Sequence, residues 1–60
     1  MKDKLQKLMD KKSVTAYKVA KETGIPMTSM YDWMSGRCEP KLDNLIKLAT
    51  YFGVDISYFL

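Results

Sequence analysis

Histidine and cysteine, two side chains that often perform catalysis or hold metals, are nearly absent from this 60-residue chain. There is no histidine, so the chain has no imidazole base, no histidine-ligated metal and no histidine pH switch. Cys38 is the only cysteine, which leaves neither an internal disulfide nor a cysteine zinc site. We therefore expect no enzyme activity, no metal, no cofactor and no small-molecule ligand. The chain is expected to work by binding a larger partner.

Basic side chains gather at one end of the chain. The net charge is +3, from ten basic and seven acidic residues. Residues 1–12 hold five lysines and two aspartates, which accounts for the whole net charge, because residues 13–60 are balanced. A basic end favours an anionic partner, with nucleic acid as the first candidate. A helix end that simply keeps the protein soluble is the plainer interpretation of the same charges.

The sequence shows no targeting or membrane signal. No apolar run approaches the roughly 20 residues that cross a bilayer, and residues 1–12 are too charged for a signal peptide. A membrane-surface helix in that segment is disfavoured, because its apolar stripe is narrow and holds neither Trp nor Phe. The single thiol, Cys38, suits a reducing compartment, so these features together predict a cytoplasmic protein without membrane contact.

The apolar spacing predicts an all-α fold, a compact bundle of about five short helices. Apolar residues recur three and four positions apart, and no stretch alternates for long enough to form a strand. Ser13 or Thr15 can cap a second helix, and Gly24, Gly36 and Gly53 suit helix ends. The predicted helices span residues 2–12, 16–23, 26–35 with Pro26 in the first turn, 42–52 and 56–60.

Helices this short are marginal alone in water, so their apolar faces must share one core. We therefore expect residues 1–60 to form a single domain. The predicted core consists of Leu5, Leu8, Met9, Val14, Val19, Ala20, Ile25, Met30, Trp33, Leu45, Ile46, Ala49, Phe52, Val54, Ile56 and Phe59.

Residues 16–35 have the features of two short helices that cross over a tight turn. Ala20 has no bulk beyond its Cβ atom, so the following helix can cross close above it, and Gly24 can take the strained turn angle. Ile25 fills the crease between the two helices. The inward-facing residues are Val19, Met30 and Trp33. This pattern predicts a helix-turn-helix motif.

The order of these features resembles the lambda-repressor/Cro-like helix-turn-helix regulators, the XRE family. The resemblance covers nearly the whole chain, because it also includes SGRCEP at residues 35–40 and LDNLIKLATYFGVDISYFL at residues 42–60. It implies sequence-specific binding of double-stranded DNA, with residues 26–35 as the recognition helix in the major groove. It further implies a bacterial or phage transcriptional repressor that acts on the nucleoid as a homodimer, on an operator with two-fold symmetry.

The site residues follow from this resemblance position by position. The residues implied to face the bases are Met27, Thr28, Tyr31 and Asp32. The residues implied to contact phosphates are Thr15, Ala16, Lys18, Ser29, Ser35, Arg37 and Lys41. The apolar chain end favours a dimer face formed by Tyr58, Phe59 and Leu60, although these residues could equally close the monomer core.

The predicted recognition helix departs from the family pattern in its charge. Residues 26–35 contain no Lys or Arg and carry Asp32, so the helix cannot supply the arginine that pairs with guanine. Three kinds of contact remain. Met27 or the Thr28 methyl group can pack on thymine methyls, and the hydroxyls of Thr28 and Tyr31 can bond to base edges or phosphates. Asp32 can accept a hydrogen bond from cytosine N4. The weak charge and the Met and aromatic content keep an alternative open, an antitoxin-like or accessory protein-interaction module on the same fold.

Overall fold

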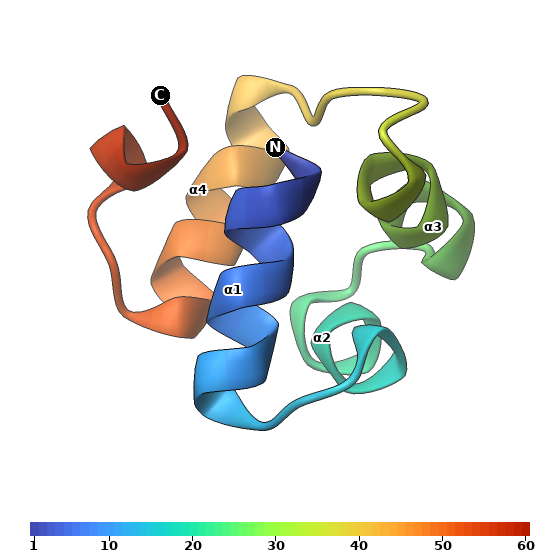
Figure 1. Ribbon diagram of the computed structural model, residues 1–60, viewed down its shortest axis with the longest axis horizontal. Helices are drawn as coiled ribbons and strands as arrows, with labels where there is room; N and C mark the ends of the chain where they lie inside the picture. The colour runs from blue at the N-terminus through green and yellow to red at the C-terminus, as the bar shows by residue number, and fades with distance from the viewer.

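The computed structural model describes residues 1–60, and all of its regular structure is helical (Figure 1). Four of the helices are α-helical and the last is a short 3₁₀-helix. In chain order they are α1 (Lys2–Lys12), α2 (Ala16–Thr23), α3 (Met27–Ser35), α4 (Leu42–Phe52) and η1 (Ile56–Phe59). This order confirms the all-α prediction and places every helix within one residue of its expected bounds.

The helix boundaries follow from capping residues. Thr15 is the N-cap of α2, and its hydroxyl accepts a hydrogen bond from the Lys18 amide at 3.2 Å. Ser13, the other candidate, instead ends α1 in the left-handed conformation, with φ of 54°. Pro26 lies before α3 rather than in its first turn, because its ψ of 141° is extended and the helix therefore begins at Met27. Asp55 caps η1 by accepting from the Ser57 amide at 2.9 Å, which lowers the pKa of its carboxyl group.

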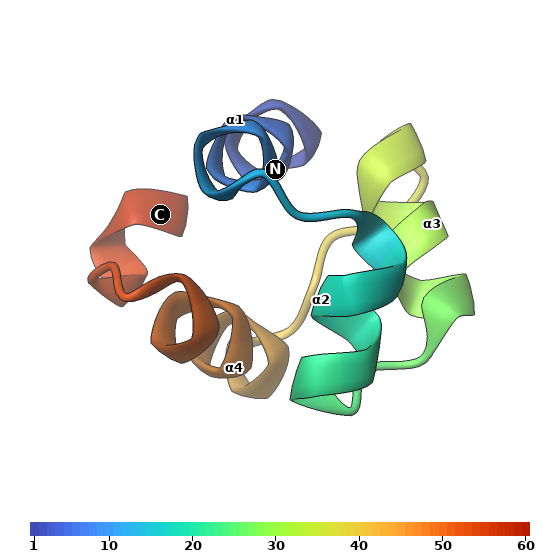
Figure 2. The same ribbon diagram turned by 90° about the horizontal axis from the view of Figure 1, so that it is seen from below.

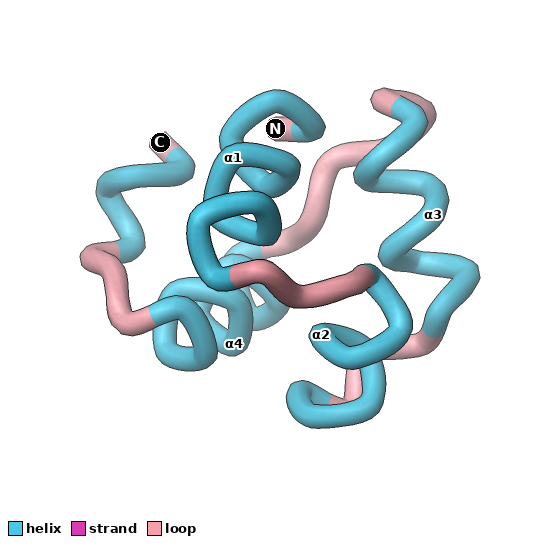
Figure 3. The backbone as a smooth tube through the Cα atoms, turned by 60° about the horizontal axis from the view of Figure 1, so that its bottom comes forward, coloured by secondary structure: helices cyan, strands magenta, loops and turns pink.

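The helices surround a common centre, with α1 and α4 on one side and the α2–α3 pair on the other (Figure 2). Their connections are short, as the tube in Figure 3 shows. The core contains only apolar side chains. Its members are Leu5, Leu8, Met9, Val19, Ala20, Ile25, Met30, Trp33, Leu45, Leu48, Ala49, Phe52 and Phe59.

The core prediction was wrong for α4 in two places. Leu48 was not expected in the core, yet it is fully buried, whereas Ile46 was expected there and is 50% exposed. The apolar arc of α4 also includes Leu42, so it is wider than the arc that the other helices cover. The packing selects the face that carries Leu45, Leu48 and Phe52, and this turns Ile46 toward solvent.

Three further predicted core residues lie at its edge. Val14, Val54 and Ile56 are half-buried and pack against the core cluster. Each lies in or beside a connection between helices, where the neighbouring elements cover one side of the residue only. They close the core without forming its centre.

Candidate nucleic-acid interface

The turn between α2 and α3 has the geometry that the sequence predicts. Gly24 ends α2 in the left-handed conformation with φ of 78°, and its amide donates to the Ala20 carbonyl at 2.9 Å. The Thr23 hydroxyl donates to the Val19 carbonyl at 2.6 Å and accepts from the Ile25 amide at 3.3 Å. These bonds fix the direction of the chain as it enters α3. Two consecutive helices joined in this way form a helix-turn-helix.

The start of α2 has backbone amides that lack an acceptor within the helix. The first backbone hydrogen bond of this helix runs from the Val19 amide to the Thr15 carbonyl at 3.1 Å. The amides of Ala16 and Tyr17 precede that bond and therefore have no acceptor within the helix. Free amides at a helix N-terminus attract anions such as phosphate. The Thr15 hydroxyl already serves the Lys18 amide as the helix cap.

The two faces of α3 differ sharply. Met30 and Trp33 are buried, with exposed fractions of 0% and 4%. Thr28 and Tyr31 are exposed on the other side, and Asp32 is half-exposed one turn after Thr28. Met27, which was expected to face the bases, is half-buried and packs against the core cluster. The polar face of α3 is therefore free, and Met27 lies at its edge.

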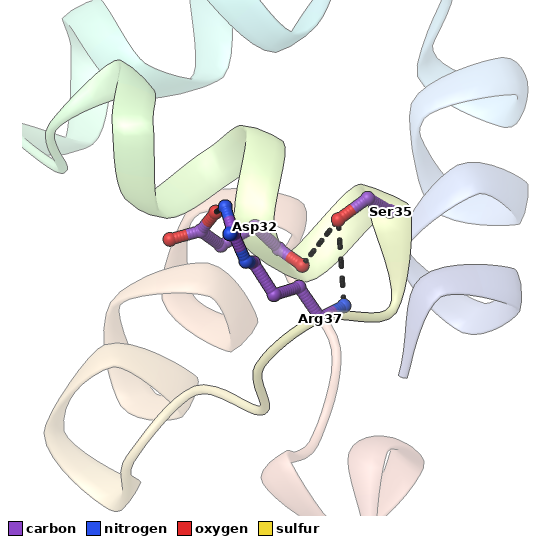
Figure 4. Close-up of polar contacts among 3 residues, drawn as sticks. All are labelled: Asp32, Ser35 and Arg37. Carbon is purple, nitrogen blue, oxygen red and sulfur yellow. Dashed lines mark hydrogen bonds and ion pairs between the residues drawn. The ribbon is translucent and has the colours of Figure 1, made fainter.

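Several hydrogen bonds to the Asp32 carbonyl fix the end of α3, and Figure 4 shows the one from Ser35. This oxygen accepts from the Arg37 amide at 3.0 Å, the Cys38 amide at 3.3 Å and the Ser35 hydroxyl at 3.0 Å. The Ser35 oxygen also accepts from the Arg37 amide at 3.4 Å. A second link joins side chains, because the Arg37 guanidinium lies 3.6 Å from the Asp32 carboxylate. This ion pair was not expected from the sequence.

The other candidate phosphate contacts surround α3. Lys18 pairs with Glu22 one turn later in α2, at 3.7 Å, and both side chains are about half exposed. Lys41 is exposed and forms no ion pair. Ser29 is half-buried in the first turn of α3. The stem of Lys2 lies against Gly36, which places one of the N-terminal lysines beside the end of α3.

The expected dimer face is only partly available. Phe59 is 9% exposed and belongs to the core of the monomer, which is the alternative role that the sequence left open for the chain end. Phe59 is buried because α4 packs against η1 and brings it against the core. Tyr58 and Leu60 remain exposed, with fractions of 37% and 79%.

Other kinds of site find little support in the structure. No group of three or more cysteine, aspartate or glutamate side chains lies close enough together to hold a metal ion. None of the helices combines the length and the apolar character that crossing a bilayer requires. The surface that most clearly combines exposed polar side chains with free amides is the one formed by α2, α3 and the loop at residues 36–41.

The fold and this surface define a small all-helical domain built around a helix-turn-helix. The family model of the Cro/C1-type HTH DNA-binding domain matches residues 4–60 of the chain. The protein therefore belongs to this family of DNA-binding domains. No curated protein and no solved structure matches the chain. Family membership supports DNA binding and a role in transcription regulation.

Proposed function

We propose that the protein binds double-stranded DNA sequence-specifically, with α3 in the major groove. The observation that carries this proposal is the polarity of α3. Met30 and Trp33 anchor one face in the core, which leaves Thr28 and Tyr31 on a free face. A major groove admits one α-helix and displays a distinct pattern of donors and acceptors for each base pair.

The base contacts come from side chains with different chemistry. Thr28 offers a hydroxyl and a methyl group, which suit a base edge and a thymine methyl respectively. Tyr31 is 61% exposed and carries a hydroxyl that can donate or accept. The exposed part of Met27 adds apolar contact at the edge of the same face. Asp32 lies on this face as well, where its carboxylate pairs with the Arg37 guanidinium.

The phosphate contacts come from backbone amides and from flanking polar residues. The first amides of α2 and α3 precede the first backbone hydrogen bonds of these helices, at Val19 and Met30, and therefore have no acceptor within the helix. Partial positive charge accumulates at such helix N-termini. We assign further contacts to Thr15, Lys18, Ser29, Ser35 and Lys41. The resemblance implied that Arg37 also belongs to this group, but its side chain pairs with Asp32 of α3.

We further propose that the protein is a transcriptional repressor that acts as a homodimer on a two-fold symmetric operator. A dimer doubles the number of phosphate contacts, which a chain with a net charge of only +3 needs. Two recognition helices related in this way read half-sites about 34 Å apart. Tyr58 and Leu60 are the proposed dimer contacts. A repressor of this kind would work in the cytoplasm, on bacterial nucleoid or phage DNA.

A protein-interaction role is the second candidate, and one observation favours it. Leu42 and Ile46, one turn apart on α4, are 62% and 50% exposed. Ile46 also lines a hollow between α2 and α4 together with Thr50 and Tyr51. Apolar side chains grouped on one helix face are typical of surfaces that contact another protein. Such a role would use α4 and leave the polar face of α3 free.

A salt titration separates these two functions. We expect the affinity for duplex DNA, measured by fluorescence anisotropy, to fall steeply with salt, because bound lysines release counterions from phosphates. The slope of log K against log salt should be about −0.9 for each phosphate neutralised, so two phosphates give about a tenfold loss for a fourfold rise in salt. An apolar protein contact on α4 would not weaken in this way.

Two lysine variants provide the control for this titration. Lys41→Ala should reduce the slope by about 0.9, because Lys41 is a proposed phosphate contact. Lys47→Ala should leave the slope unchanged, because Lys47 lies on α4 in the hollow beside Thr50 and Tyr51. Two results would contradict the proposed interface. One is an affinity for DNA that does not depend on salt, and the other is an equal reduction of the salt slope in Lys41→Ala and Lys47→Ala.

A further inference from the structure

The recognition helix α3 contains no arginine, yet the fold brings one to it. Arg37 follows α3 by two residues, and its side chain turns back toward the last turns of the helix (Figure 4). The guanidinium nitrogen Nη1 lies 3.6 Å from Oδ1 of Asp32. Asp32 in turn lies one turn after Thr28, on the polar face of α3. A positive group from the loop is therefore placed beside the face that is proposed to read DNA.

The backbone holds this arrangement in place. Gly36 ends α3 in the left-handed conformation with φ of 81°, which reverses the chain. The Arg37 amide then donates to the Asp32 carbonyl at 3.0 Å. Arg37 is thus tied to Asp32 twice, through its main chain and through its side chain. The two links limit how far the guanidinium can move from α3.

Most of the guanidinium remains available for a ligand. The Arg37 side chain is 77% exposed and that of Asp32 is 38% exposed. A guanidinium carries five N–H donors, and the contact with Asp32 involves one nitrogen. The free donors form a planar fork that matches two acceptors side by side. Guanine presents such a pair, O6 and N7, in the major groove.

We propose that Arg37, oriented by Asp32, reads a guanine in each half-site. This inference rests on the proposed function, because it requires α3 to lie in the major groove. It assigns Arg37 the base contact that residues 27–35 cannot make by themselves. Asp32 becomes a positioning residue for the guanidinium, and the ion pair neutralises a carboxylate that would otherwise face the DNA unpaired. A phosphate contact from Arg37 is the competing outcome.

The experiment begins with selection of bound sites from a random duplex pool by the unaltered protein. Each position of the selected half-site is then replaced by the other three base pairs, and anisotropy gives the affinity for every duplex. We expect one position at which guanine is preferred by roughly tenfold. Arg37→Ala should abolish that preference while its affinity for unrelated duplexes falls only a few-fold.

Two further variants separate geometry from charge. Arg37→Lys keeps the positive charge and loses the fork, so it should keep the salt slope and lose the guanine preference. Asp32→Asn should reduce the guanine preference while the affinity for unrelated duplexes stays equal or rises, because a negative charge near DNA has been removed. Lys41→Ala, in the same loop, should weaken all duplexes by the same factor and leave every base preference intact.

Two results would overturn the inference in distinguishable ways. If Arg37→Ala weakens every duplex by one common factor, Arg37 contacts phosphate only, and the proposed function survives without this reading role. If the unaltered protein selects no duplex, the proposed function fails and the inference fails with it. Circular dichroism of each variant confirms that the fold is retained, and we expect no loss because both side chains lie at the surface.

Discussion

Trp33→Ala is expected to unfold the protein at room temperature. Trp33 extends from α3 into the core and is only 4% exposed. Replacing a buried Trp by Ala typically costs about 3–5 kcal/mol. A domain of this size has a total free energy of unfolding of roughly 3–5 kcal/mol, so the substitution removes most or all of it. Urea titration followed by far-ultraviolet circular dichroism measures the change.

Tyr31→Ala is the matched control on the same helix. Tyr31 lies two residues before Trp33 and is 61% exposed, so its replacement should change the free energy of unfolding by about 0.5 kcal/mol or less. Its effect should appear in DNA affinity instead. If Trp33→Ala unfolded at the same urea concentration as the unaltered protein, Trp33 could not lie in the core and the described placement of α3 would be contradicted. A Tyr31→Ala variant that is unfolded would contradict it equally.

Leu48→Ala should also destabilise the protein severely. Leu48 is fully buried among the residues that α4 contributes to the core. Truncation of a buried Leu costs about 2–5 kcal/mol, because apolar contacts are lost and a cavity remains. The single tryptophan, Trp33, lies in the same core, so its fluorescence reports unfolding of this variant.

Ile46→Ala tests the same helix from its other side. Ile46 is 50% exposed, and we expect the loss of stability to stay below about 1 kcal/mol. If Ile46→Ala lowered the free energy of unfolding more than Leu48→Ala, α4 would have to be rotated about its axis so that Ile46 faces the core. The comparison therefore measures the orientation of α4 directly.

The helices of this protein were predictable because capping residues mark their ends. Thr15, Gly24 and Gly36 each impose a local conformation that neighbouring elements do not change, and all three end or begin helices as expected. The rotation of α4 was not predictable in this way. Its apolar arc includes both Ile46 and Leu48, and only the packing of other helices decides which of the two is buried.

In the candidate site too, features set by neighbouring residues were predictable, whereas features set by the path of the chain were not. The free face of α3 follows from helical spacing, since Met30 and Trp33 must point inward and Thr28 and Tyr31 then point outward. The pairing of Arg37 with Asp32 depends on the path of the loop after Gly36, which spacing does not describe. The sequence left the role of Phe59 open for a similar reason, because its burial depends on how η1 folds against α4.

The central claim, that α3 and its flanks form the DNA-binding surface, is tested most directly by nuclear magnetic resonance. The isotopically labelled protein is titrated with the duplex recovered by selection, and the change in each amide shift is recorded. We expect the largest changes at the start of α2, along the exposed face of α3 and in residues 36–41, with little change at Leu42 and Ile46 on the outer face of α4. Changes concentrated on α4 or η1, with α3 unaffected, would contradict the proposed interface.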